Sequence, residues 1–239
     1  MDPAPPTDSG SLALLLLADG RFPAGGHAHS AGVESAVADG RITDETTLEA
    51  FVHGRLVTTG LADAALAVAT AHRLANALPG VRAGTVIAQL DAEADVRIQP
   101  IVLRHASRRL GRQLARATAR CWPCGELAEL AGQFPDGAHQ SVVLGCVAVA
   151  TGASVQDVAA VAVHHAITTP AQAGVRLLGL DPFGVAALIA RLHPVAAQVA
   201  DDAVRLGTST LADLPARSAP LIDIAATHHA GLEVRLFAT

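Results

Sequence analysis

The chain contains no lysine, and all 17 of its basic residues are arginine. A nucleotide-binding P-loop needs a lysine that contacts the phosphates, and a Schiff-base enzyme needs a lysine amine as its nucleophile. The absence of lysine therefore excludes both kinds of site. We expect no GTPase or ATPase activity that depends on a P-loop of this chain.

Aromatic residues are scarce as well, at 3% of the 239 residues, while 51% of the residues are hydrophobic. Alanine, valine and leucine dominate the hydrophobic set. Alanine and leucine are strong helix formers, and few aromatic side chains remain to build strands. Because no alternating strand pattern stands out either, the composition predicts an all-α fold.

Positive charge is limited too, because the net charge is −5 at pH 7 and no face of the chain is obviously basic. We therefore expect no nucleic acid partner. Asp2 and Asp8 stand where a signal peptide would carry positive charge, and no run of about 18 uncharged apolar residues predicts a membrane span. Three cysteines without a secretory signal indicate a cytoplasmic protein with reduced thiols.

Helical spacing, capping residues and helix breakers divide the chain into about ten helices of a single compact domain. The expected segments cover 12–18 (a helix or a strand), 30–38, 44–60, 61–78, 100–122, 126–131, 138–150, 154–168, 170–180, 182–193, 194–206 and 219–230. Residues 81–99 are ambiguous and are expected to be a linker with some helix. Pro170 and Pro194 are placed at helix starts, because proline breaks a helix interior. The segment 100–122 is amphipathic, with arginines on its solvent face.

Three regions make up the expected domain organisation. Residues 1–10 are rich in proline and aspartate and are expected to be disordered. Residues 11–230 are expected to form the all-helical domain, and residues 231–239 a C-terminal tail. No internal repeat and no low-complexity linker divides the chain further.

The stretch "RFPAGGHAHSAGVE" at 21–34 carries two histidines and a glycine pair. Two histidines at positions i and i+2 point the same way only on a strand, and a metal site needs further ligands from elsewhere. We therefore expect His27 and His29 to be structural, with metal binding as the alternative. Gly25 and Gly26 lack the preceding strand and the spacing of a dinucleotide-binding loop, so they predict a tight turn.

The remaining cysteines and histidines carry no enzyme signature. Cys121 and Cys124 have the spacing of a redox pair but lack its βαβ context, and Cys146 is expected to be a buried hydrophobic residue. The neighbouring pairs at 164–165 and 228–229 point about 100° apart on a helix and cannot chelate a metal together. No HExxH or GxSxG motif occurs, so we expect no catalytic residue.

Four blocks of sequence, in order, resemble the UreF-type urease accessory proteins. They are "LLLLADGRFPAGGHAHSAGVESAVADGRI", "RHASRRLGRQL", "AGVRLLGLDPFGVAALIARLHP" and "APLIDIAATHHAGLEVRLFAT". The first block begins at Leu14 and the last ends at Thr239, so the resemblance covers nearly the whole chain. The chain departs from the family pattern at 179–182, which is one residue short, and at its end, where Ala238 and Thr239 replace an Arg-Ser pair.

The resemblance implies an all-α homodimer that catalyses nothing alone and holds no cofactor. It implies three partners: a UreD/UreH-type accessory protein, a nickel-carrying GTPase of the UreG type and apo-urease. The complex would deliver nickel to urease, and the P-loop would belong to the GTPase. Two alternatives remain, a helical metal-dependent enzyme that uses His27 and His29, and a helical adaptor outside the urease system.

The resemblance also implies which residues bind partners. They are Pro23, Gly25, Gly26, His27, Ser30, Gly32, Glu34, Arg176, Arg235, Leu236 and Phe237. We expect the C-terminal tail to become ordered when the UreD/UreH-type protein binds. Leu236 and Phe237 would then be buried, and Arg235 would pair with a carboxylate.

Overall fold

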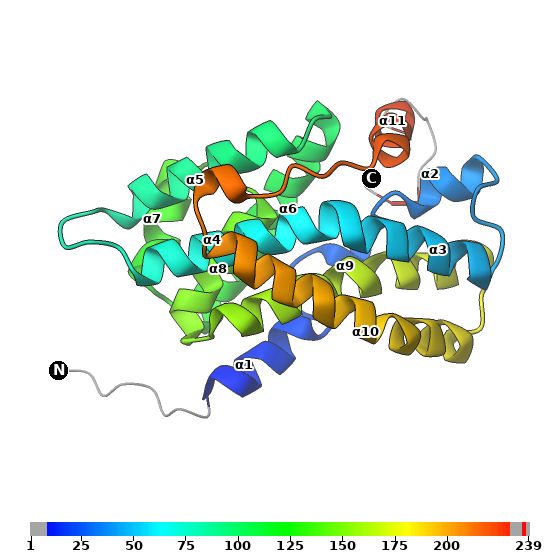
Figure 1. The fold of residues 1–239 in the computed structure, drawn as a ribbon, viewed down its shortest axis with the longest axis horizontal. Helices are drawn as coiled ribbons and strands as arrows, with labels where there is room; N and C mark the ends of the chain where they lie inside the picture. Colours follow the sequence, from blue (N-terminus) through cyan, green and yellow to red (C-terminus); the bar gives the residue numbers. More distant parts are fainter. Residues whose placement is uncertain (1–8, 230–235, 238–239) are drawn as a thin grey trace.

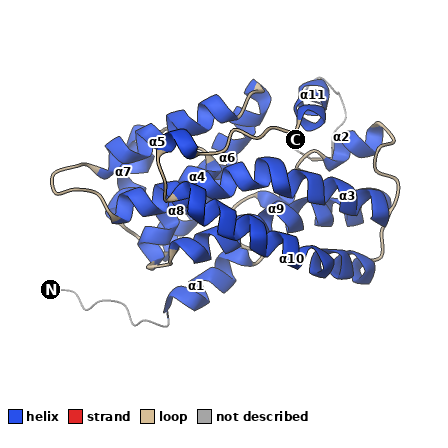
Figure 2. Ribbon diagram, in the orientation of Figure 1, coloured by secondary structure: helices blue, strands red, loops and turns tan. Residues whose placement is uncertain are grey.

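The computed structural model describes residues 9–229 and residues 236–237. Within this part of the chain every regular element is helical and no strand occurs (Figure 2). The α-helices are α1 (Ser9–Ala18), α2 (Val33–Ala38), α3 (Glu45–Arg55), α4 (Leu61–Ala75), α5 (Ala83–Arg97), α6 (Ile101–Cys121), α7 (Gly125–Gln133), α8 (Gln140–Thr151), α9 (Val155–Leu178), α10 (Pro182–Gly207) and α11 (Pro220–His229). Three short helical turns join them: η1 (Gly26–Ala28), η2 (Leu56–Gly60) and η3 (Leu211–Asp213). The prediction of a single all-α domain is confirmed.

Helix α4 is the centre of the fold and packs against α8, α9 and α10 (Figure 1). Its residues 61–62 and 64–71 are all buried. A helix that is hydrophobic all round is buried all round, and small side chains let its neighbours approach closely. On α8, a Cβ added to Gly145 would lie 2.6 Å from the carbonyl oxygen of Ala67. The alanine-rich composition therefore produces a core of closely spaced helices.

Two predicted helix starts are confirmed by their capping contacts. The Asp44 carboxylate accepts a hydrogen bond of 2.8 Å from the backbone N–H of Thr47 and so caps α3. The Ser154 hydroxyl and the Asp157 carboxylate form the reciprocal capping box that opens α9. These local contacts satisfy N–H groups that have no partner inside the helix.

Other predicted boundaries are wrong because packing outweighs the local signals. Pro170 and Pro194 lie inside α9 and α10 rather than at helix starts. A proline inside a helix costs about 3 kcal/mol, but α9 and α10 pack against each other and against α4, and each carries buried side chains on both sides of its proline. Gly60 does not end a helix either, because the π-helical turn η2 joins α3 directly to α4.

The ambiguous segment and the chain ends also differ from expectation. The expected linker at 81–99 is the helix α5, with Ile87 and Leu90 fully buried. The helix expected from 30 begins only at Val33. Ser9 opens α1, so the expected disordered segment is too long, and its residues 1–8 lie outside the described residues.

By length and composition alone, α10 could cross a membrane. One such helix is weak evidence, because core helices of globular proteins pass the same test. Val185, Leu188 and Leu192 of α10 are buried, and the helix packs against α4 and α9. The structure therefore explains its apolar face as part of the helical core.

Candidate docking site

Residues 21–34, which we call the opening stretch, form a turn whose path depends on two glycines. Gly25 has φ +83° and Gly32 has φ +94°, a left-handed conformation that side chains rarely adopt. A Cβ on Gly25 would lie 2.9 Å from Oε1 of Gln113 on α6. A Cβ on Gly32 would lie 3.1 Å from Cγ2 of Ile222 on α11. The stretch therefore lies against α6 at one end and against α11 at the other, and the prediction of a tight turn at Gly25 is confirmed.

The two histidines of this stretch occupy different environments. His27 is exposed, and its carbonyl oxygen accepts a hydrogen bond of 2.8 Å from Nη1 of Arg176. His29 is buried, and its pKa is lowered to about 4, first by burial and then by the charges of Arg109 and His27. Among the described residues, the group with metal-binding geometry includes neither histidine.

The last described residues return to this stretch from about 200 positions away. Oε1 of Glu34 accepts a hydrogen bond of 2.7 Å from the backbone N–H of Leu236, and Oε2 accepts one of 3.2 Å from that of Phe237. The guanidinium carbon of Arg176 lies 4.5 Å from the centre of the Phe237 ring, which is a cation–π distance. We call Glu34, Arg176, Leu236 and Phe237 the C-terminal clasp.

The two side chains at the end of the clasp differ in exposure. Phe237 is 7% exposed and belongs to the hydrophobic core, whereas Leu236 is 78% exposed. The structure thus differs from the expectation that both become buried only with a partner, because Phe237 already packs inside this chain. The physical reason is that Glu34 binds the backbone and Arg176 covers the ring. Arg235 lies outside the described residues.

Three further residues implied by the resemblance, Pro23, Gly26 and Ser30, belong to the same stretch of sequence as Glu34. Pro23 is exposed, and Gly26 opens the turn η1 with no atom close enough to require a glycine. Ser30 is fully buried, and its hydroxyl has no hydrogen-bond partner among the described residues. Neighbouring α11 carries two exposed apolar side chains, Leu221 and Ile224. Helix α11, which packs against the helix α2 that carries Glu34, therefore leaves two apolar side chains accessible.

A second polar centre joins α5, α6 and the start of α8. Nε2 of His139 lies 2.9 Å from Oδ1 of Asp95. The backbone N–H of His139 donates a hydrogen bond of 2.8 Å to Oδ1 of Asp91. Nη2 of Arg108 lies 2.8 Å from a second oxygen of each aspartate. Nδ1 of His139 lies 3.0 Å from the Ser107 hydroxyl. Sequence reasoning missed this centre, although Asp91 and Asp95 have helical i, i+4 spacing.

The contacts of this centre indicate a structural role. Asp91, Asp95 and His139 have the geometry of a metal site, but each of their ligand atoms already has a protein partner. Burial lowers the pKa of His139 despite its aspartate partners, which keeps the ring neutral. Burial opposes ionisation of Asp95, but His139 and Arg108 outweigh it and lower the pKa of its carboxyl. A neutral histidine can donate from Nε2 to Asp95 and accept at Nδ1 from Ser107.

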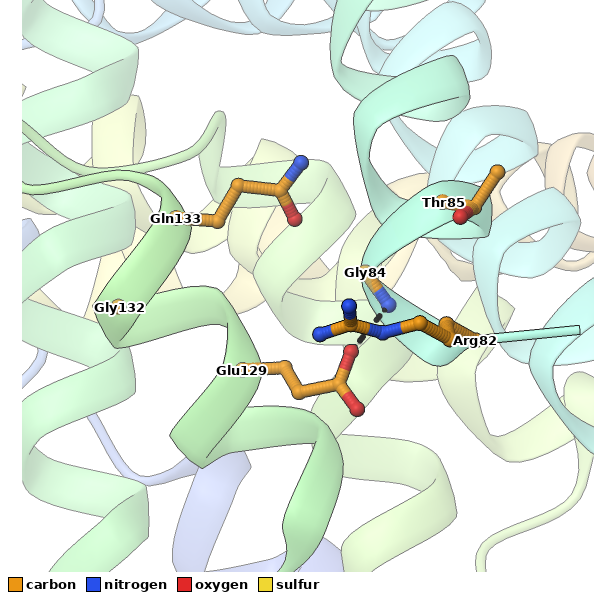
Figure 3. Close-up of a pocket in the computed structure, with 6 residues that line it drawn as sticks. All are labelled: Arg82, Gly84, Thr85, Glu129, Gly132 and Gln133. Carbon is orange, nitrogen blue, oxygen red and sulfur yellow. Dashed lines mark hydrogen bonds between the residues drawn. The ribbon is translucent and has the colours of Figure 1, made fainter.

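A cavity of about 460 Å³ lies between α5 and α7, far in sequence from the clasp residues (Figure 3). Its lining residues are Arg82, Gly84, Thr85, Glu129, Gly132 and Gln133. Oε2 of Glu129 accepts a hydrogen bond of 2.7 Å from the backbone N–H of Gly84. The N-terminus of α5 is therefore already capped by a carboxylate of the chain itself.

The three cysteines are free thiols. Cys121 is exposed and Cys124 is half-buried, at the junction between α6 and α7. Cys146 is completely buried, which confirms the expectation of a small hydrophobic residue, and burial raises the pKa of its thiol. No catalytic arrangement stands out around these groups in the described part of the chain.

Comparison with known proteins gives consistent matches along the chain. The sequence model of the UreF family matches residues 42–193. A relative from Mycobacterium sp. (strain JLS), named urease accessory protein UreF, is 40% identical over 227 residues, which cover 95% of this chain and 97% of the relative. A relative of the same name from Mycolicibacterium vanbaalenii is 39% identical, and the match covers 95% of this chain and 97% of the relative. Another from Mycobacterium tuberculosis is 40% identical, and the match covers 92% of this chain and 94% of the relative. The chain belongs to the UreF family of urease accessory proteins.

Proposed function

We propose that this protein is a non-catalytic scaffold for nickel insertion into urease. It bridges a UreD/UreH-type accessory protein and a nickel-carrying GTPase of the UreG type, and it acts with them on apo-urease. It works as a homodimer in the cytoplasm and holds no cofactor of its own. Family membership supports an accessory role in urease maturation, and the absence of lysine supports a role in which a partner, rather than this chain, supplies the P-loop.

The C-terminal clasp is the observation that indicates which residues of this protein bind a partner. It joins the opening stretch, α9 and the end of the chain through Glu34, Arg176 and Phe237. It leaves the Leu236 side chain 78% exposed beside a structured backbone. An exposed apolar side chain on a backbone that is already held in place requires less ordering of the backbone on binding, which favours a docking role.

The remaining residues of the opening stretch support the clasp in this proposal. Gly25 and Gly32 permit the backbone path, and Arg176 holds the carbonyl of His27 while it covers the Phe237 ring. These residues shape the surface that the UreD/UreH-type protein contacts, together with Pro23, Gly26 and Ser30. Arg235 is proposed to pair with a carboxylate of that partner.

The test is a substitution of the exposed member of the clasp. Leu236→Ser should leave folding intact, because the side chain is not buried, and should weaken capture of the UreD/UreH-type protein at least tenfold. The matched control is Leu78→Ser, which removes a leucine that is 74% exposed between α4 and α5. Calorimetry with the purified partner measures both dissociation constants.

Deletion of residues 232–239 is a poorer test, because it also removes the buried Phe237 ring. Equal affinities for the wild type, Leu236→Ser and Leu78→Ser would show that Leu236 is not a docking residue. Loss of affinity in both variants alike would indicate a general effect of surface leucines rather than a site at the clasp.

A further inference from the structure

Helix α6 presents a row of arginines to solvent. The exposed members are Arg109, Arg112, Arg116 and Arg120, and exposed His105 precedes them. Side chains three or four positions apart lie on one face of a helix. At 1.5 Å per residue the four arginines cover about 16 Å of the helix. We call these four residues the arginine stripe.

The fold itself does not use the arginine stripe. The opposite face of α6 holds Leu114, Ala115 and Thr118, which are buried, and α6 packs against α8. The two other arginines of the helix have internal partners: Arg108 pairs with the aspartates of α5, and Arg104 donates to the carbonyl of Gln99. In the described part of the chain, no ion pair involves any of the four stripe arginines.

The charge pattern of α6 is unfavourable for the isolated chain. The helix has six arginines and no aspartate or glutamate. Like charges three or four positions apart destabilise a helix, and only the last turn gains from the helix dipole. The expectation that no face of the protein is basic is therefore wrong, because helical spacing gathers these arginines while the whole chain remains acidic.

We propose that the arginine stripe is a docking surface for an acidic protein face. A guanidinium group binds a carboxylate through two parallel hydrogen bonds. All four side chains of the stripe are arginines, so each of them can bind a carboxylate in this way. An acidic partner would relieve the repulsion along α6. This inference rests on the proposed function only in expecting a protein partner.

Charge and shape favour an acidic protein over a second copy of the chain, a nucleic acid or a membrane as the partner of the arginine stripe. A second copy of the chain paired through the stripe by two-fold symmetry would bring like charges together. A nucleic acid would meet a chain with a net charge of −5 and a helix without aromatic side chains for stacking. A membrane would need an exposed apolar face, whereas the apolar side of α6 is buried in the core.

The stripe adjoins the opening stretch. Gln113 of α6 lies against Gly25, and the charge of Arg109 contributes to the lowered pKa of buried His29. A partner that contacts the opening stretch can therefore reach the first arginines of the stripe without a change in the fold.

Charge reversal on the full chain tests the proposal. The triple variant Arg112→Glu, Arg116→Glu, Arg120→Glu is compared with the control Arg82→Glu, Arg205→Glu, Arg217→Glu, which changes the net charge equally at exposed positions elsewhere. Circular dichroism first establishes that both variants fold. Dissociation constants are then measured with each purified partner, a UreD/UreH-type protein, a UreG-type GTPase and apo-urease, at about 50 and about 300 mM NaCl.

We expect the stripe variant to weaken binding of one partner at least tenfold at low salt and the control to weaken it less than threefold. The wild-type affinity for that partner should fall as salt rises. Equal effects of the two variants, or none, would overturn the docking surface while leaving the proposed function intact.

A wild type that binds none of the three proteins would contradict the proposed function instead. The proposed role of the arginine stripe is then tested by measuring the binding of poly-L-glutamate at low salt. Binding that only the stripe variant loses supports an acidic protein face. The proposal is overturned if both variants bind poly-L-glutamate equally well. It is also overturned if the wild type binds a short DNA duplex or phosphatidylserine vesicles more tightly than poly-L-glutamate.

Discussion

At the scale of single residues, Glu34 makes the most consequential contacts of the clasp. Each of its carboxylate oxygens accepts a hydrogen bond from a backbone amide near the C-terminus. A carboxylate can serve both amides because all of its lone pairs accept, whereas a carboxamide offers one accepting oxygen and a nitrogen that only donates. Charge and acceptor number therefore both matter at this position.

The variant Glu34→Gln tests the role of this carboxylate. It should speed hydrogen exchange of the Leu236 and Phe237 amides roughly tenfold to a hundredfold, because a hydrogen bond to a charged group contributes about 1.5–3 kcal/mol. The control is Glu129→Gln, which alters the carboxylate that caps Gly84 on α5. Exchange rates at the C-terminus that do not respond to Glu34→Gln would show that the clasp does not depend on the carboxylate.

At the scale of helices, the close approach of α8 to α4 determines how the core is packed. Gly145 faces Thr70 and Ala67, and no room is left for a methyl group between the two helices. The backbone atoms of α4 that face Gly145 cannot move away from an added methyl group as a flexible side chain can. The contact therefore requires the smallest residue, although glycine lowers the intrinsic helix propensity of α8.

We expect Gly145→Ala to lower the free energy of unfolding by about 1–3 kcal/mol, the usual cost of inserting a methyl group into a filled core. Gly132→Ala in α7 is the matched control, because no atom lies within 4 Å of the added Cβ. That control should be neutral or slightly stabilising, since alanine favours a helix. Urea unfolding measures both, and equal midpoints for the two variants would contradict this account of the α4–α8 contact.

At the scale of the whole molecule, buried and half-buried histidines link stability to pH. Burial lowers the pKa of His29, His139, His164 and His165 in the folded chain. The unfolded chain, with ordinary histidine pKa values near 6.5, then binds more protons than the folded chain below that pH. Stability is therefore full above about pH 6.5 and decreases as the pH falls toward the folded pKa values.

Urea unfolding at about pH 7.5 and about pH 5 tests this linkage. The pKa of His29, lowered to about 4, should by itself reduce the free energy of unfolding by roughly 2 kcal/mol between these conditions. In His29→Gln the dependence on pH should be smaller by that amount. A protein that is equally stable at both pH values would show that the four histidines are not kept neutral by burial.

Local sequence signals by themselves determined much of the fold. Alanine and leucine content specified helices, and the candidate caps Thr43 or Asp44, and Ser154, indicated the starts of α3 and α9, because a cap satisfies N–H groups a few residues away. The four ordered blocks also indicated the family that the comparisons show.

Tertiary structure alone decided the rest. Packing against neighbouring helices carries α9 through Pro170, where local propensity predicts a break. The meeting of His139 with Asp91, and that of Glu34 with Phe237, joins residues far apart in the chain. Such contacts depend on how whole helices stack, and that arrangement is fixed by the burial of their apolar faces rather than by any short pattern of residues.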